Sequence, residues 1–133
     1  MRILLVDDEP PLVRLLETFL CRRGYEVDAC MKPAAALDLF RASPKRYALV
    51  LADVTMPEMS GDELVLRIAA LSDTVRILLT SGLPFDIDRF PENIRRRTCF
   101  LQKPFLPNMV TEMIGRLVGD GGDRPGTAST PAG

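Results

Sequence analysis

Acidic, hydroxyl and lysine side chains follow the short apolar runs of this 133-residue chain, at the points where the runs end. In open α/β sheets, sites form beyond the carboxyl ends of the strands, which meet at one edge of the sheet. If the apolar runs are parallel strands, these polar side chains converge on one rim. They are, in chain order, Asp7, Asp8, Glu9, Asp53, Thr80, Ser81 and Lys103.

This set of side chains favours phosphoryl chemistry with a hard metal ion. Three carboxylates held close together repel one another unless cations lie among them. Mg²⁺ prefers one or two carboxylates together with waters and phosphate oxygens, and Lys103 would supply a further positive charge. An ionised aspartate can attack phosphorus and form an aspartyl phosphate, while the protein mainly positions the group and neutralises its charge.

Five short segments have the composition of β-strands. Residues 3–6 and 47–52 are nearly continuous apolar runs, typical of strands that are buried on both faces of a parallel sheet. Residues 75–80 and 98–102 are similar but weaker. Residues 25–30 alternate apolar and polar side chains, which predicts an edge strand with one solvated face.

Amphipathic helices are predicted between these strands. The first begins at Pro10 and Pro11, where proline is tolerated, and Gly24 follows its end as a C-cap. Pro84 and Pro91 interrupt the segment 84–97 and leave room for a short helix only. A βα unit repeated about five times indicates a doubly wound α/β fold, with a five-stranded parallel sheet and helices on both faces. The other predicted helices are 33–42, 61–71 and 107–118.

The end of the chain differs from the rest. Residues 119–133 are rich in Gly, Pro, Ser and Thr and nearly lack apolar side chains, which predicts a flexible tail or the stub of a linker. We therefore expect one domain over residues 1–118. The apolar start of the chain stops at Asp7, too early for a membrane-spanning segment.

Composition excludes several classes of function. A net charge of −1 argues against direct nucleic-acid binding, which normally needs a basic surface. The chain has no histidine, so it has neither a Ser/His or Cys/His pair nor a phosphohistidine of its own. Its three cysteines lack a C-x-x-C spacing, which points away from zinc and disulfides and suits a reduced, cytoplasmic setting.

Four motifs in order resemble the receiver domains of two-component response regulators, over roughly residues 2–118. The resemblance implies a flavodoxin-like sheet with strand order 2-1-3-4-5 and a function in phosphorelay signal transduction. The irregular 83–97 segment departs from the regular fourth helix of DNA-binding regulators and looks more like receivers attached to hybrid histidine kinases. The motifs are V-D-D-E, A-D-V-T-M-P-x-M-S-G, L-L-T-S-G and K-P-F.

The resemblance assigns a role to each polar residue of the rim. Asp53 matches the phosphoacceptor, and Lys103 matches the lysine that contacts the phosphoryl group. Asp7 and Asp8 match the acidic pair that binds Mg²⁺, with Asp8 the more direct ligand. Thr55 would offer its backbone carbonyl to the metal, and Asp53 would also be a ligand.

The resemblance also identifies residues that would transmit the signal. The switch hydroxyl belongs to Thr80 or Ser81, and the spacing to Lys103 favours Ser81. Phe100 matches the switch aromatic, but it lacks the hydroxyl of the tyrosine found in many members.

Three consecutive arginines occupy residues 95–97. We interpret this run as a solvated helix end.

The function implied is a signalling switch, in which a histidine kinase or phosphotransfer protein supplies the phosphoryl group. The face 82–106 would engage a partner or form a homodimer. A turnover enzyme is not expected, because aspartyl-phosphate phosphatases need a second acid two residues after the nucleophile, where this chain has Thr55. A nucleotide or flavin binder is disfavoured because no G-x-x-x-x-G-K or G-x-G-x-x-G motif occurs.

Overall fold

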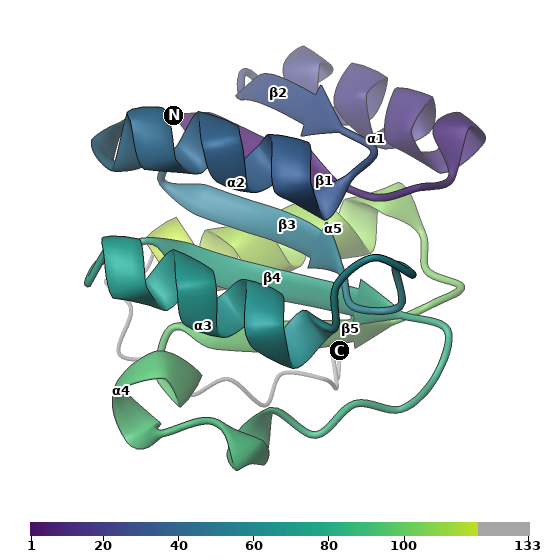
Figure 1. Ribbon diagram of the computed structural model, residues 1–133. Coiled ribbons are helices and arrows are strands. Elements are labelled where there is room, and N and C mark those ends of the chain that lie inside the picture. Colours follow the sequence, from purple (N-terminus) through teal and green to yellow (C-terminus); the bar gives the residue numbers. More distant parts are fainter. Residues whose placement is uncertain (120–133) are drawn as a thin grey trace.

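Five parallel strands form one sheet in the order β2-β1-β3-β4-β5 (Figure 1). The structure is a computed structural model, and it describes residues 1–119. The predicted sheet and strand order are confirmed, including the position of the second strand at an edge. The strands are β1 (Arg2–Val6), β2 (Glu26–Cys30), β3 (Leu49–Asp53), β4 (Arg76–Ser81) and β5 (Thr98–Gln102).

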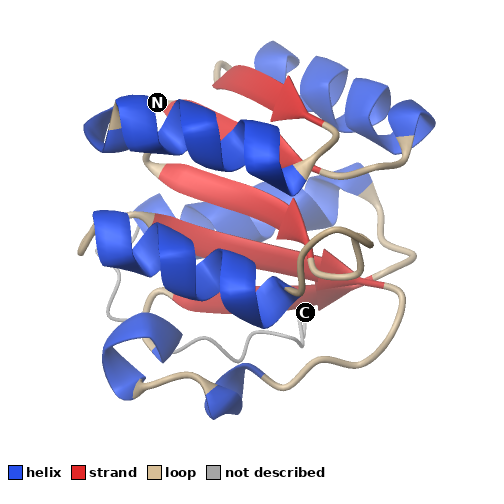
Figure 2. Ribbon diagram, viewed as in Figure 1, coloured by secondary structure: helices blue, strands red, loops and turns tan. Residues whose placement is uncertain are grey.

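Helices cover both faces of the sheet (Figure 2). In the view of Figure 1, α2, α3 and the short α4 lie in front of the strands, and α1 and α5 lie behind. The last helix continues beyond its α-helical part as a π-helical segment, Gly115–Gly119. The α-helices are α1 (Pro10–Arg22), α2 (Pro33–Ala42), α3 (Gly61–Leu71), α4 (Glu92–Arg95) and α5 (Pro107–Ile114); two 3₁₀ turns are Pro44–Arg46 and Ile87–Arg89.

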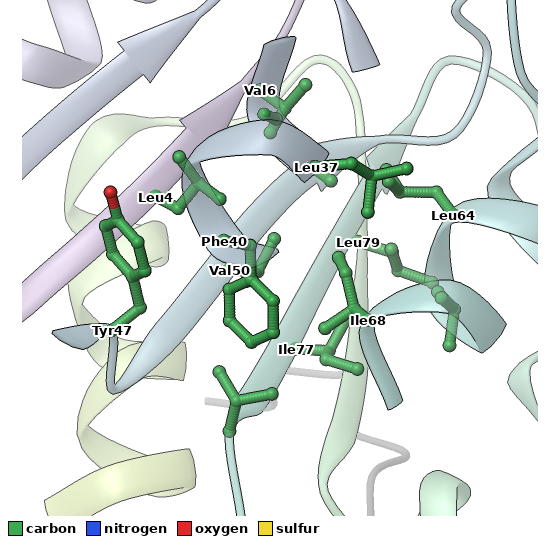
Figure 3. Close-up of a cluster of buried hydrophobic side chains, with 14 of the residues drawn as sticks. Leu4, Val6, Leu37, Phe40, Tyr47, Val50, Leu64, Ile68, Ile77 and Leu79 are labelled. Atoms are coloured by element: carbon green, nitrogen blue, oxygen red, sulfur yellow. The ribbon is translucent and has the colours of Figure 1, made fainter. Parts of the chain in front are cut away.

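Alternate residues of the central strands supply two separate hydrophobic clusters. In β1, Leu4 and Val6 pack with α2 and α3, whereas Ile3 and Leu5 pack with α1 and α5. Figure 3 shows the first cluster, with Phe40 among the strand side chains. Each fully buried Leu or Ile stabilises the fold by about 1.5–3 kcal/mol. Burial on both faces explains why these strands are apolar without alternation.

The end of α1 confirms the predicted glycine cap. Gly24 has a φ of 94°, a left-handed conformation that glycine adopts without steric cost. Its N–H donates to the carbonyl of Cys21, and the N–H of Tyr25 donates to the carbonyl of Leu20. This pair of bonds is a Schellman motif, which satisfies carbonyls that the helix end leaves without partners.

A polar network ties the edge strand β2 to its neighbours. Asp28 accepts hydrogen bonds from Arg2 at 2.7 Å and from the Tyr47 hydroxyl at 2.6 Å. Tyr47 precedes β3, so this strand starts two residues later than the apolar run predicted. The Tyr47 ring stacks on that of Phe40, with the ring centroids 6.0 Å apart. Burial is the main cause that raises the pKa of Tyr47 to about 12, and the hydrogen bond to Asp28 is the second.

Arg97 corrects the interpretation of the 95–97 run as solvated. Its guanidinium is buried and donates to the carbonyls of Ser72 at 2.9 Å, Val75 at 3.1 Å and Asn93 at 3.3 Å. It thereby joins the segment before β4 to the end of α4. Arg96, the preceding residue, is exposed as the prediction required.

The described residues contain no helix that is both long and apolar enough to cross a membrane. The predicted domain boundary after residue 118 stays a prediction, and the tail predicted from residue 119 onward lies, apart from the backbone of Gly119, outside the described residues.

Gly61 provides a test of how tightly the loop after β3 packs. A Cβ at this position would overlap Cβ and Cγ1 of Val54. We expect Gly61→Ala to lower the free energy of unfolding in urea by about 1–3 kcal/mol, because the loop must shift. Gly115→Ala is the matched control, since a Cβ there meets no atom within 4 Å and helix propensity favours alanine. Equal stability changes in the two variants would contradict the packing argument.

Arg97→Met should lower the free energy of unfolding by about 2–3 kcal/mol, because the buried carbonyl of Val75 and the partly buried bonds to Ser72 and Asn93 lose a charged donor. Arg96→Met removes the same side-chain type from an exposed position and should change stability by less than about 0.5 kcal/mol. Urea denaturation of both variants measures the difference. A similar small effect in both would show that the Arg97 bonds contribute little.

Candidate functional site

The register of the sheet brings the polar strand ends together. Val6 pairs with Ala52, so Asp7 follows next to the position of Asp53. Asp53 in turn pairs with Thr80 across β3 and β4. At the far side, the N–H of Lys103 donates to the carbonyl of Ser81 at 2.8 Å. The predicted convergence on one rim is therefore confirmed as geometry.

The Lys103 ammonium is bonded to three carboxylates. Its Nζ lies 3.1 Å from Oδ2 of Asp7, 3.1 Å from Oδ2 of Asp53 and 2.9 Å from Oε1 of Glu9. Burial alone would lower the pKa of Lys103, but the hydrogen bonds to Glu9, Asp7 and Asp53 outweigh it and raise the pKa above its ordinary value. Lys103 therefore stays charged and offsets the acids around it.

Asp7 and Asp53 are both nearly inaccessible to solvent. Burial raises the pKa of Asp7, although the backbone N–H of Glu9 and the Lys103 ammonium act in the opposite direction. Oδ1 of Asp53 accepts the backbone N–H of Thr55 at 2.9 Å and its hydroxyl at 2.6 Å. The two bonds from Thr55 orient the Asp53 carboxylate, with its other oxygen toward Lys103.

The acidic residues at this rim fit a hard divalent cation. Asp7, Asp8 and Asp53 each offer a carboxylate oxygen, and these atoms lie within 4.8 Å of one another. Ligands on opposite sides of an octahedral Mg²⁺ are about 4.2 Å apart, so small side-chain movements would suffice. Asp8 is exposed, whereas the other two are buried. The donor set is all oxygen, which is what Mg²⁺ prefers.

The two predicted switch residues are consecutive at the end of β4, where neighbouring side chains point to opposite faces of the sheet. Thr80 and Ser81 are both buried, and among the described residues neither hydroxyl bonds to the Asp53 carboxylate. The Ser81 Oγ accepts the backbone N–H of Leu83 at 2.9 Å. Ser81 thus links the rim to the segment that follows β4, while the choice between the two hydroxyls stays a prediction.

Aromatic contacts hold the segment after β4 over the sheet. The ring of Phe85 lies 6.0 Å from that of Phe90 and 6.0 Å from that of Phe100, measured between centroids. Phe100 is partly buried in this cluster. Arg89 stacks on Phe85 at 4.7 Å and donates to both carboxylate oxygens of Asp62 at 2.8 and 2.7 Å. This segment therefore contacts both β5 and the start of α3.

An open pocket of about 550 Å³ borders the Lys103 side of the rim. It gives access to the polar cluster from solvent. Its lining is mainly apolar apart from two charged side chains, and exposed Leu83 and Leu106 belong to the loops that border it. The lining residues are Glu9, Leu12, Gly82, Lys103, Pro104 and Phe105.

Glu9 is the residue of the cluster to which the sequence assigned no role. It ends the acidic run after the first strand, so its nearness to Asp7 and Asp8 was evident. An acid at the start of a helix is ordinarily explained as a helix-end charge, and the bond to Lys103 joins residues 94 positions apart.

The peptide bond between Lys103 and Pro104 is cis.

Comparisons with known proteins agree with this arrangement. The family model of the response regulator receiver domain matches residues 3–115. The rice two-component response regulator ORR26 is 31% identical over 105 residues, which is 78% of this chain and 18% of that protein. The chain thus spans less than a fifth of this relative's length.

Solved structures with the same fold include receivers from different contexts. The receiver domain of the hybrid histidine kinase CckA superposes with a TM-score of 0.75 at 25% identity, covering 88% of this chain and 98% of that one. A crystal structure of the histidine kinase ThkA in complex with the response regulator protein TrrA matches with a TM-score of 0.73 at 30% identity, covering 88% and 97%.

Mg²⁺ should stabilise the folded protein through the acidic cluster. At a free concentration ten times the dissociation constant, binding adds about 1.4 kcal/mol to the free energy of unfolding, which raises the thermal midpoint by a few degrees. Asp8→Asn should remove most of this shift, because it takes one ligand from the set. Asp88→Asn, at an exposed position outside the cluster, is the control. An unchanged Mg²⁺ effect in Asp8→Asn would exclude this metal site.

Proposed function

The chain belongs to the response regulator receiver domain family, and we propose that it accepts a phosphoryl group on Asp53 in a Mg²⁺-dependent reaction. The phosphorylated state then presents a changed surface to a partner or an output domain. The observation that carries the proposal is the bond of Lys103 to both Asp7 and Asp53 within a cluster of acids that suits a metal ion.

The geometry of Asp53 suits a nucleophile. Thr55 holds one carboxylate oxygen, and the other lies at the Lys103 side of the rim. In the proposed step an oxygen of Asp53 bonds to phosphorus, and the bond from phosphorus to the phosphohistidine nitrogen breaks with its electron pair leaving on nitrogen. Lys103 would bind the transferred group's oxygens and offset their charge.

Mg²⁺ would be held by Asp8, Asp53 and Asp7, with the Thr55 carbonyl as a further ligand. When bound, it supplies charge neutralisation for the phosphoryl oxygens and fixes their orientation. The chain's own residues contribute the nucleophile, the ammonium and the oriented carboxylates. This division agrees with phosphoryl transfer in general, where proteins act mainly by positioning and electrostatics.

The donor would be a histidine kinase or a phosphotransfer protein. The chain has no histidine, so the phosphohistidine must come from another molecule or domain. The open pocket beside Lys103 gives such a donor a route to the site, and Leu83 and Leu106, each 65% exposed, offer apolar contacts around it. The ThkA–TrrA complex shows that a related pair associates.

The signal would leave the site through the segment after β4. Ser81 holds the N–H of Leu83, so movement of the hydroxyl toward a phosphoryl group would release this N–H. The face 82–106, which includes Phe85 and Phe100, would then change and engage a partner or a second copy. We propose a switch and not a turnover enzyme, because turnover of a phosphate ester would need an acid where Thr55 stands. We also propose a cytoplasmic setting, in which the three cysteines of the chain stay reduced.

Phosphorylation of the intact protein tests the proposal. Incubation with phosphoramidate or acetyl phosphate and Mg²⁺ should add one phosphoryl group, detected by intact-protein mass spectrometry. Asp53→Asn should not be labelled, because an amide cannot form the acyl phosphate. Asp88→Asn, an exposed acid outside the cluster, should label like the unchanged protein.

Chelation of Mg²⁺ should suppress the labelling of the unchanged protein. The proposed function is excluded if no label forms with either donor, or if Asp53→Asn is modified as rapidly as the unchanged protein. If Asp88→Asn were labelled more slowly than the unchanged protein, charge outside the cluster would govern the reaction.

A further inference from the structure

One ion pair attaches the segment after β4 (residues 82–91) to α3. Nη1 of Arg89 donates to both carboxylate oxygens of Asp62, at 2.8 and 2.7 Å. Among the described residues, no other hydrogen bond or ion pair joins this segment to α3. In Figure 1 the segment and α3 lie on the same side of the sheet. The Asp62–Arg89 pair is therefore the polar contact that fixes the segment relative to the helix.

The start of α3 packs against the residue that follows the phosphoacceptor. Gly61, the first residue of the helix, lies so close to Val54 that a Cβ would overlap it, and Val54 directly follows Asp53. Asp62 is the next residue of the helix. Close packing thus holds the Asp62 carboxylate at the loop that begins at Asp53.

Arg89 belongs to the stretch of chain that begins at the switch hydroxyl. The Ser81 Oγ accepts the N–H of Leu83 at 2.9 Å, and Arg89 follows in the same segment. The Arg89 guanidinium also stacks on the Phe85 ring, 4.7 Å from its centroid, and Phe85 lies against Phe100. The ion pair thus joins the two stretches of chain that leave Asp53 and Ser81.

The exposure of the pair suits a contact that can open. The side chains of Arg89 and Asp62 are 49% and 42% exposed, so water weakens their attraction and solvates both charges once they separate. Asp62 has a short side chain on a packed helix, so the segment cannot move away from α3 while both bonds persist. Ile87 and Phe90 are buried in the first hydrophobic cluster and hold the segment on the core independently of the pair.

We propose that the Asp62–Arg89 pair is a latch, which holds the segment after β4 against α3 in the unphosphorylated protein and opens when Asp53 is phosphorylated. The proposal rests on the proposed function, in which movement of the Ser81 hydroxyl releases the N–H of Leu83. The released segment shifts relative to α3 only by separating Arg89 from Asp62. The latch therefore stabilises the resting state, and its loss increases the population of the switched state.

Beryllofluoride, an anion that takes the place of a phosphoryl group on a carboxylate, measures this bias. We expect Asp62→Asn to bind it about two- to fivefold more tightly than the unchanged protein at saturating Mg²⁺, followed by ¹⁹F NMR. Glu63→Gln is the matched control, because Glu63 is also an acid in the first turn of α3 but pairs with Arg67 of the same helix. Its affinity should equal that of the unchanged protein.

A double variant separates the ion pair from other effects of the two side chains. If the pair carries the bias, Asp62→Asn should change the affinity by less than about 1.5-fold in the Arg89→Gln background, because its partner is already gone. High salt should also reduce the difference between Asp62→Asn and the unchanged protein, since both charges are exposed enough to be screened.

Backbone amide signals show whether the population shifts. Without ligand, Asp62→Asn should move the ¹H–¹⁵N signals of Leu83 and Phe100 toward their positions in the beryllofluoride-bound protein, and Glu63→Gln should leave them in place. With saturating ligand, these signals should coincide in the unchanged protein and Asp62→Asn, because the latch is then open in both.

Equal or weaker binding by Asp62→Asn would overturn the latch while leaving the phosphoacceptor function intact. The same conclusion would follow if the full effect of Asp62→Asn persisted in the Arg89→Gln background, or if the amide signals did not move toward their ligand-bound positions. Failure of the unchanged protein to bind beryllofluoride and to be labelled by small phosphoryl donors would instead overturn the proposed function, and the latch with it.

Discussion

The rest of the site depends on the contact of one ammonium group with three carboxylates. Lys103 follows β5, Asp7 follows β1 and Asp53 ends β3, so the contact forms only if three strands keep their register. A slip of one residue would turn every side chain of a strand to the opposite face. Close packing opposes such a slip, because it would exchange the side chains that fit the two hydrophobic clusters. The core thereby sets the positions of the charges as well as the stability of the fold.

Local patterns predicted most of this arrangement. Continuous apolar runs identified the central strands, and the polar residues after them identified the rim, since parallel strands end together. Gly24 was recognisable because few other residues adopt its left-handed conformation. Arg97 was wrongly interpreted: its partners are carbonyls that precede β4, and contact between segments so far apart leaves no local pattern.

The same limit applies to Glu9 and to the start of β3. An exposed acid before a helix has an ordinary explanation, and its bond to Lys103 follows from tertiary structure that the run V-D-D-E does not reveal. Tyr47 continues an apolar run but lies before the strand, and its hydroxyl is bonded to Asp28 on β2. Glu9 and Tyr47 each form a long-range hydrogen bond, and the neighbouring sequence does not indicate the partner.

The network around Asp28 has a consequence for assembly. β2 is an edge strand, and an unprotected edge can pair with a strand of another molecule and start aggregation. Glu26 and Asp28 put carboxylates on this short strand, and the bonds of Asp28 to Arg2 and Tyr47 hold one of them in place. A foreign strand would have to bring its own side chains against these charges. The bonds that attach β2 to the sheet thus also discourage the sheet from growing.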